Sequence, residues 1–289
     1  MEALRRLLEE STGRAPRAWR ESPVAGGCIH QAHRLRTDCG DFFLKRAPQA
    51  EGELLRSEAW GLRELAATGT VRVPGVVGCL TEGDTALLVL EWIDLQPLDG
   101  PSGAQLGETL ARLHSTRTTP TYGAERDNFI GRTPQPNRPH ATWADFFVEE
   151  RLRPQWERAR QDGAPLPESA SLLEEAHHLL ADHAPPPAPL HGDLWGGNAA
   201  ADAHGHPVVF DPAHYRGDPE TDLAWTKMFG GFPASFYDAY DRHLPPRAGR
   251  EMRAPLYNLY HMLNHLNLFG RSYLPAVEEG VRSVRAAAR

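Results

Sequence analysis

The sequence predicts an α+β fold in two lobes, a small N-terminal antiparallel-sheet lobe and a larger, mainly helical C-terminal lobe. Strand patterns are frequent in the first third of the chain. A short connection rich in proline, glycine and aspartate follows at residues 93–103. Helical periodicity then continues to the end of the chain. We therefore expect an N-terminal lobe at residues 1–92, a C-terminal lobe at residues 93–289, and a ligand site in the cleft between them.

In the N-terminal lobe, the sequence predicts two helices and several strands. Residues 1–14 form a charged amphipathic pattern with leucines on one face. Residues 53–68 carry leucine and alanine at helical spacing, and Gly69 follows as a stop signal. The predicted strands lie at residues 34–37, 41–45, 71–77 and 85–90.

The C-terminal lobe is predicted to be a series of helices. A long loop containing proline and asparagine at residues 116–140 separates the first helix from the others. The predicted helices lie at residues 104–115, 143–160, 169–183, 219–229, 234–243 and 250–269.

The composition argues against several classes of protein. A formal net charge of −7 and a pI near 6.1 do not suit a nucleic-acid partner. Three irregularly spaced cysteines argue against a disulfide framework and a zinc site. No apolar run approaches the roughly 20 residues of a membrane span, and the N-terminus lacks the apolar core of a secretory signal. We expect a globular protein of the cytoplasm, with no nucleic-acid or membrane partner.

The segment that carries the chemistry is LHGDLWGGN, which ends at Asn198, together with the later VVFD, which ends at Asp211. Asp193 and Asn198 have the spacing of the Asp and Asn in a kinase catalytic loop. Phosphoryl transfer needs a carboxylate that orients the acceptor hydroxyl and receives its proton, and oxygen ligands for Mg²⁺. We assign Asp193 to the first role and Asn198 and Asp211 to the second. We expect His191 to brace the loop rather than to act as a base.

Each of these residues also has a plain structural interpretation. Asp193 alone could cap a turn, and Asp211 alone could end a strand. A hairpin formed by residues 198–201 and 207–210 would bring Asp211 back beside Asn198. The combination at this spacing therefore favours catalysis.

The nucleotide side of the site is predicted from weaker signals. Lys45 ends a strand and could contact ATP phosphates, with Glu58 on the following helix as its best partner and Glu51 or Glu53 as weaker ones. A surface salt bridge is the alternative. Further candidates are the tight turn of Gly26 and Gly27, which could approach phosphate, and the backbone of Glu91, Trp92 and Ile93, which could bind adenine.

At this point the sequence resembles the fructosamine kinase (ketosamine-3-kinase) family, which is similar to aminoglycoside phosphotransferases and has a protein-kinase-like fold. The resemblance rests on LHGDLWGGN, on FDPA from Phe210, and on MFGGFP from Met228, and it covers nearly the whole chain. Trp195 and the MFGGFP run separate the family from the aminoglycoside enzymes. The turn of Gly26 and Gly27 departs from a glycine-rich loop, because it continues as CIHQAH without another glycine.

The resemblance implies ATP- and Mg²⁺-dependent phosphorylation of the 3-hydroxyl of a ketosamine, such as a fructosamine or ribulosamine, as a deglycation repair. The substrate could be a small molecule or a protein-bound adduct. It also implies that Asp222 braces the catalytic loop. On the substrate side, Trp195 and Trp225 could form flat walls for a sugar, and His265 or Asn264 could bind its hydroxyls, although each equally suits a core position.

Two other functions remain open at this level. One is a kinase of another small hydroxyl compound, such as an aminoglycoside or choline. The other is a pseudokinase that binds nucleotide and acts as an interaction module, which the poor glycine loop would suit. The sequence does not distinguish a monomer from a homodimer.

Overall fold

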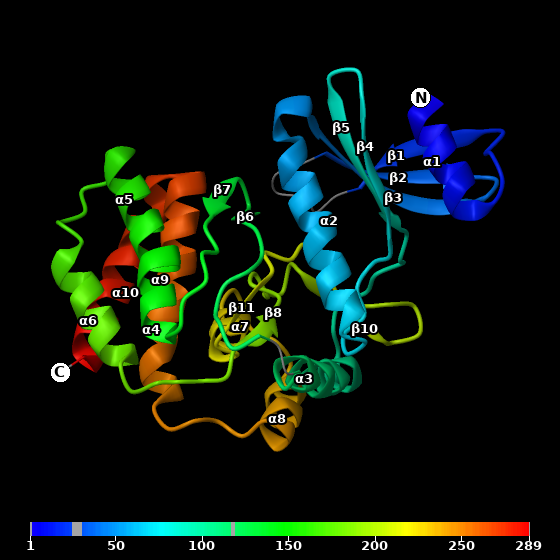
Figure 1. The fold of residues 1–289 in the computed structure, drawn as a ribbon. Helices are drawn as coiled ribbons and strands as arrows, with labels where there is room; N and C mark the ends of the chain where they lie inside the picture. The colour runs from blue at the N-terminus through cyan, green and yellow to red at the C-terminus, as the bar shows by residue number, and fades with distance from the viewer. Residues whose placement is uncertain (1, 25–30, 117–118, 289) are drawn as a thin grey trace.

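The computed structural model describes residues 2–24, 31–116 and 119–288. Figure 1 shows the strands of one sheet, with α1 and α2, at one end of the molecule and most of the helices at the other. The N-terminus lies beside the sheet, and the C-terminus lies at the helical end (Figure 1). The α+β architecture is therefore divided into a sheet part and a helical part.

The sheet is antiparallel, with five strands in the order β1-β2-β3-β5-β4. Its strands are β1 Trp19–Pro23, β2 Gln31–Thr37, β3 Gly40–Pro48, β4 Val76–Glu82 and β5 Thr85–Glu91. The helices of this part are α1 Glu2–Thr12 and α2 Gly52–Ala67, with a 3-10 turn at Gln49–Glu51 before α2.

The strand β5 shows how the sequence covers both faces of this sheet. Leu87 and Val89 belong to a cluster of buried residues with the leucines of α1. Leu88 and Leu90 alternate with them and pack in a second cluster with Leu55 of α2. Successive side chains of a strand point to opposite faces, so a continuous apolar strand fits a sheet that is buried on both sides.

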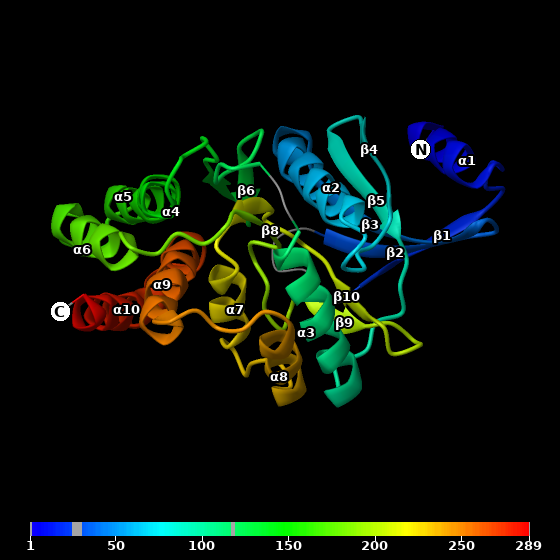
Figure 2. The ribbon, with the colours of Figure 1, turned by 60° about the horizontal axis from the view of Figure 1, so that its bottom comes forward.

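The helical part contains eight α-helices and several short antiparallel strand pairs in the described residues. The helices are α3 Gly100–His114, α4 Trp143–Phe146, α5 Arg153–Gln161, α6 Ala170–Leu180, α7 Glu220–Thr226, α8 Ala234–His243, α9 Arg250–Phe269 and α10 Leu274–Ala287. A π-helical turn at Phe147–Leu152 joins α4 to α5, and a 3-10 turn lies at Arg271–Tyr273. The strand pairs are β6 Asn128–Ile130 with β7 Thr133–Gln135, β8 Ala188–Leu190 with β11 Tyr215–Gly217, and β9 Ala199–Ala201 with β10 Pro207–Val209. Figures 1 and 2 both place α3 beside α8 and α9 beside α10.

Among the predicted elements, one strand and one helix differ most from the structure. The strand expected at residues 71–77 begins only at Val76, because Pro74 has no N–H for a ladder and the carbonyl of Arg72 accepts instead from the N–H of Val209. The helix expected at residues 143–160 is interrupted by the π-helical turn, which lets the fully buried Arg151 reach Asn137. The helix α10 was not predicted at all.

The sheet and the helical part share one apolar core. The cluster that contains Leu88 of β5 continues through Leu106 and Leu110 of α3 to Val209 of β10. The connection after β5 is tied to the same hairpin, because Gln96 and Ala201 exchange two backbone hydrogen bonds of 2.8 Å. The β9–β10 hairpin, which is flanked by the predicted metal residues Asn198 and Asp211, is thus held beside the connection. Among the residues described, no helix has the length and apolar character to cross a membrane.

Candidate active site

A buried lysine joins the sheet to the predicted metal residue. Lys45 on β3 donates from Nζ to both carboxylate oxygens of Glu58 on α2, at 2.8 and 2.9 Å. The same ammonium contacts Oδ1 of Asp211. Glu53 is not its partner, since Glu53 accepts from Arg56. One cation therefore links two carboxylates from elements that are far apart in the sequence.

The charges in this cluster are strongly coupled. Burial by itself would lower the pKa of Lys45, but Asp211 and Glu58 raise it above its usual value. Burial raises the pKa of Glu58 to about 8 against the opposing effect of Lys45. Burial also favours the neutral form of Asp211, yet Lys45 holds the pKa of Asp211 below its usual value. The ammonium thus keeps Asp211 ionised, which suits a carboxylate that has to bind a cation.

Asp193 lies in the loop between β8 and β9, about a quarter of its side chain exposed, at 24%. Its Oδ1 accepts from the indole Nε1 of Trp225 at 2.9 Å. The side-chain amide of Asn198 donates to the carbonyl of Asp193 at 2.8 Å and to its Oδ2 at 3.2 Å. Burial raises the pKa of Asp193 to about 7, although the Trp225 hydrogen bond lowers it in part. A carboxylate with a pKa near neutral is suited to receive a proton from a hydroxyl and to release it again.

Asp211 follows β10 in a left-handed conformation, with φ of 56°. Aspartate adopts this region more readily than most residues. The preceding Phe210 donates its N–H to the carbonyl of Asn198 at 3.0 Å, and this bond holds the two predicted metal residues together. The ring of His191 bonds on one side to the carbonyl of Phe210 at 2.9 Å and on the other to the N–H of Asp193 at 3.3 Å. His191 therefore makes the contacts of a brace between the two segments.

Asp222 on α7 holds the backbone of the same loop. Its two carboxylate oxygens accept from the N–H groups of His191 and Gly192, both at 2.8 Å. The buried ring of His114 lies 3.2 Å from Oδ2 of Asp222. Gly192 has φ of 85°, and a Cβ there would lie 2.1 Å from the carbonyl oxygen of Ala213. The loop can therefore take this shape only with glycine at that position.

The donor set at Asn198 and Asp211 fits a Mg²⁺ ion. The amide nitrogen of Asn198 is committed to Asp193, which leaves the amide oxygen for a cation. Asp211 adds carboxylate oxygens, and hard oxygen donors are the ligands that Mg²⁺ prefers. A second cluster of metal-binding residue types, His183, Asp218 and Glu220, has its ligand atoms within 4.8 Å of one another.

That second cluster is already satisfied by protein partners. Asp218 Oδ2 lies 2.7 Å from Nε2 of His183 and accepts from the hydroxyl of Tyr257 at 2.6 Å. Glu220 accepts two hydrogen bonds, of 2.7 and 2.8 Å, from the guanidinium of Arg253. We therefore interpret it as a buried polar network that joins α7 to α9.

Aromatic rings gather on the other side of Asp193. Trp225 is fully buried, whereas Trp195 is half-buried and packs its ring over Gly197. Phe229 contacts the rings of both tryptophans, with centroids 5.6 Å from Trp195 and 5.4 Å from Trp225. His265 closes the group at 5.4 Å from Trp225. The three residues predicted for the substrate side are thus neighbours, and Asn264 is buried instead, within hydrogen-bond distance of Gln155.

The residues predicted for adenine lie where the sheet meets the connection. The carboxylate of Glu91 turns back to Arg72 at 2.8 Å and to the N–H of Gly75 at 3.0 Å. Trp92 packs under the guanidinium of Arg34, which lies 4.3 Å from its ring centroid. The side chains of Glu91 and Trp92 thus bind other parts of the protein, and the N–H of Glu91 donates to the carbonyl of Gly75 at 2.8 Å. A nucleotide would use the remaining backbone groups from Glu91 to Ile93. The predicted turn at Gly26 and Gly27 lies outside the described residues.

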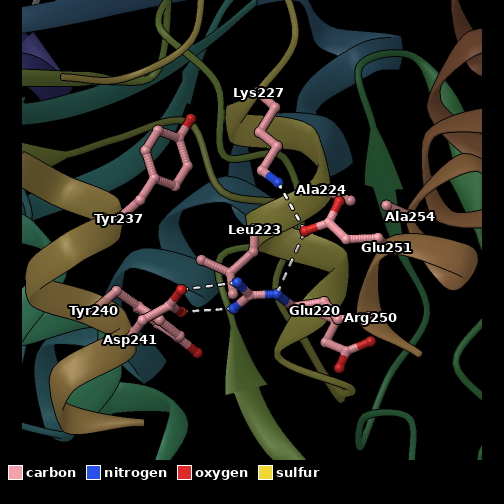
Figure 3. Close-up of a pocket in the computed structure, with 10 residues that line it drawn as sticks. All are labelled: Glu220, Leu223, Ala224, Lys227, Tyr237, Tyr240, Asp241, Arg250, Glu251 and Ala254. Atoms are coloured by element: carbon pink, nitrogen blue, oxygen red, sulfur yellow. Dashed lines mark hydrogen bonds and ion pairs between the residues drawn. The ribbon is translucent and has the colours of Figure 1, made fainter. Parts of the chain in front are cut away.

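Two cavities are lined by residues other than those predicted for the site. Figure 3 shows the smaller one, of about 20 Å³, between α7, α8 and α9, where Lys227 pairs with Glu251 and Arg250 pairs with Asp241. This is room for about one water molecule. The larger cavity, of about 450 Å³, lies behind the Asp222 brace and is lined by residues that include His114 and Asp218.

Sequence reasoning missed three residues of this region. His114 braces Asp222 from α3, a contact across 108 residues that no local pattern reveals. His261 on α9 stacks on Trp225, and Phe229 joins the two tryptophans. Phe229 could have been found, because it lies inside the MFGGFP run.

Comparisons with known proteins identify the family. The family model described as fructosamine kinase matches residues 1–286. A probable ketoamine kinase of Synechocystis sp. is 42% identical over 92% of this chain and 90% of its own. The chloroplastic protein-ribulosamine 3-kinase of Arabidopsis thaliana is 37% identical over 95% of this chain and 86% of its own.

Solved structures give the fold. A "putative fructosamine-3-kinase" of Thermobifida fusca superposes with a TM-score of 0.85 at 32% identity, covering 99% of both chains. The choline kinase LicA of Streptococcus pneumoniae, at 15% identity, covers 98% of this chain and 99% of its own with a TM-score of 0.65, which bears on the fold alone. The fold is of the protein-kinase-like type, and the chain belongs to the fructosamine kinase family.

Proposed function

We propose that this protein is an ATP- and Mg²⁺-dependent kinase that phosphorylates the 3-hydroxyl of ketosamines, such as fructosamine or ribulosamine adducts. The observation that carries the proposal is the position of Asp193, whose carboxylate is held between Trp225 and Asn198 at the edge of an aromatic cluster. The names of the relatives, ketoamine kinase and protein-ribulosamine 3-kinase, support the substrate class.

On the nucleotide side, the chain would neutralise and orient phosphate groups. Lys45 is held in place by Glu58 and is available to ATP once Asp211 turns to the metal. Asn198 and Asp211 would hold Mg²⁺, which supplies positive charge to the phosphates. The backbone from Glu91 to Ile93 would receive the adenine.

On the acceptor side, Asp193 would accept the proton of the 3-hydroxyl as its oxygen bonds to the γ-phosphorus and ADP leaves. The half-buried Trp195 and His265 border the same place as the buried Trp225 and are available to pack against the sugar and its amine. Such a substrate could be free or attached to a protein. We place the protein in the cytoplasm, because its few cysteines form no disulfide framework in the sequence.

The test is turnover on defined ketosamines. Purified protein is incubated with MgATP and fructosyl-lysine or ribulosyl-lysine, ADP release is measured, and ³¹P NMR locates the phosphate on the sugar. We expect an ester at O3. No turnover on any ketosamine, together with turnover on an aminoglycoside or on choline, would show that the substrate class is wrong. If MgATP stabilises the protein against heat but none of these substrates is phosphorylated, the protein is a pseudokinase.

A further inference from the structure

Two rings on α7 and α9 form one stack beneath the carboxylate of Asp193. Trp225 is fully buried and donates its indole N–H to Oδ1 of Asp193 at 2.9 Å. The imidazole of His261 lies flat on that indole, with ring centroids 4.2 Å apart and an angle of 11° between the planes. This stack is far closer to parallel than the other contacts of Trp225 with Phe229 and His265, whose planes are tilted by 86° and 62°.

His261 covers one face of the indole of Trp225. Apart from the N–H, an indole has no polar group that could fix its rotation in the pocket. His261 belongs to the long helix α9, and only 4% of its surface is exposed, so its ring has little freedom. A flat, immobile ring against the indole face keeps the N–H directed at Asp193.

His261 itself is not placed to contact an acceptor. Its Nδ1 is buried, has no hydrogen-bond partner in the part of the chain that the structure describes, and lies 3.9 Å from Oδ1 of Asp193. Burial lowers the pKa of His261 to about 3, so the ring is neutral. A buried, neutral imidazole below the carboxylate can shape the site without taking part in the reaction.

The helix α7 then holds the loop at two points. Asp222 and Trp225 are three residues apart, so they share one face of the helix. Asp222 fixes the backbone N–H groups of His191 and Gly192, and Trp225 fixes the side chain of Asp193. With Oδ1 engaged by the indole, Oδ2 has a single hydrogen bond to the described residues, the 3.2 Å contact with Asn198.

We infer that Trp225 and His261 are positioning residues for Asp193: the indole holds Oδ1 so that Oδ2 receives the acceptor proton, and His261 keeps the indole in place. This inference depends on the proposed function in one respect only, namely that the acceptor is a ketosamine. The proton of the acceptor hydroxyl moves to Oδ2 while the oxygen–phosphorus bond forms and the bond to ADP breaks. The atoms of the reaction are those of the kinase step, and no further reactant is needed.

The kinetic test uses variants that separate the N–H from the ring. Trp225→Phe keeps an aromatic ring and loses the donor, and we expect kcat to fall about tenfold or more with KM for ATP unchanged. His261→Phe keeps a flat ring and is expected to retain kcat, whereas His261→Ala is expected to resemble Trp225→Phe. Trp156→Phe is the matched control, because Trp156 is also buried and donates its indole N–H, to the carbonyl of Pro167 at 3.1 Å.

Coupling to Asp193 separates positioning from general loss of structure. In an Asp193→Asn background, Trp225→Phe should cause no further fall in single-turnover rate, because the base it positions is already absent. An equal fall in both backgrounds would overturn the inference, as would a Trp225→Phe enzyme with at least half the wild-type kcat. A His261→Phe enzyme as impaired as His261→Ala would overturn the role of the stack.

A second readout does not depend on activity. The chain has seven tryptophans, so the ¹H–¹⁵N spectrum contains up to seven indole signals, and Trp225→Phe identifies the one that belongs to Trp225. Asp193→Ala should move this signal upfield as the hydrogen bond is lost, and His261→Ala should broaden or move it. An unmoved signal in Asp193→Ala would overturn the contact. If the signal moves while the wild-type protein phosphorylates no ketosamine, the proposed function fails and the positioning stands.

Discussion

The nucleotide side and the acceptor side of the candidate site are built from different interactions. On the nucleotide side, Lys45 binds two carboxylates, those of Glu58 and Asp211, in a buried cluster of charges. On the acceptor side, the carboxylate of Asp193 meets an indole N–H and a group of packed rings. Asn198 and the Asp222 brace lie between the two.

This difference assigns different tasks to the two sides. A cluster of charges recognises phosphate by its negative charge. Substitution of one charged residue in such a cluster is strongly unfavourable, because it leaves the remaining buried charges without a partner. Packed rings recognise the shape and the apolar faces of a substrate. Removal of one ring weakens substrate binding only in part, because the other rings remain in contact. We therefore expect variants of the charge cluster to impair kcat and KM for ATP together, and variants of rings that only border the acceptor, such as Phe229, to impair KM for the ketosamine alone.

The largest effect is expected at Asp193, the carboxylate of the acceptor side. Asp193→Asn keeps Oδ1 for the indole of Trp225 but replaces Oδ2 by an amide that takes up no proton, so kcat should fall about 10³-fold. Steady-state and single-turnover assays with MgATP and fructosyl-lysine measure it. Asp202→Asn, at the turn of the β9–β10 hairpin, is the control and should stay within about twofold. Full activity of Asp193→Asn would rule out the proton-acceptor role.

The nucleotide side should show the next largest effect. Lys45→Met removes the ammonium that we propose to orient phosphate, so kcat/KM for ATP should fall about 10²-fold while KM for the ketosamine stays unchanged. The control is Lys227→Met, which removes the chain's other lysine from its exposed pair with Glu251. A change in KM for the ketosamine of the same size would contradict the separation of the two sides.

The two sides also differ in how far they could be predicted from the sequence. Asp193, Asn198 and Asp211 could be grouped because a short local hairpin brings them together, and Glu58 could be paired with Lys45 because α2 directly follows β3. The stack of Trp225 on His261 depends on how α7 packs against α9, and periodicity does not determine the packing of helices.

The errors in the fold have local origins instead. The strand predicted at residues 71–77 had the right apolar residues, and Val71 and Val73 are buried, but Pro74 prevents a ladder. The helix α10 was missed although its sequence carries a helical signal, because Leu274, Val277, Val281 and Val284 recur at helical spacing and Val277 and Val284 are buried. In the strand predicted at residues 71–77, the local composition thus predicted which side chains are buried but not which backbone groups pair in a sheet.

Phe229 tests the acceptor side by itself. It is 53% exposed, has φ of 54° and contacts both tryptophans of the site. Phe229→Ala should raise KM for the ketosamine by about fivefold to tenfold, since one aromatic contact is worth about 1 kcal/mol, with kcat and KM for ATP unchanged. Met252→Ala, at another exposed apolar residue, is the control.

The backbone conformation of Phe229 allows a second test, on the stability of the protein. Phe229→Gly loses the same ring but relieves a left-handed conformation that costs a non-glycine residue about 1 kcal/mol. Urea denaturation should therefore find Phe229→Gly more stable than Phe229→Ala, with the same rise in KM. Equal KM values for wild type and both variants would remove Phe229 from the acceptor side.

The smallest effect is expected at Glu91, although it belongs to the predicted adenine segment. Its carboxylate binds Arg72 and the N–H of Gly75, so it faces the sheet's own loop rather than a nucleotide. Glu91→Gln should change KM for ATP less than about twofold and lower stability by less than about 1 kcal/mol, the usual value of a partly exposed ion pair. ATP titration and thermal denaturation measure the two. A tenfold rise in KM for ATP would show that the side chain, and not only the backbone, contacts the nucleotide, and the nucleotide side would then extend to the connection between the lobes.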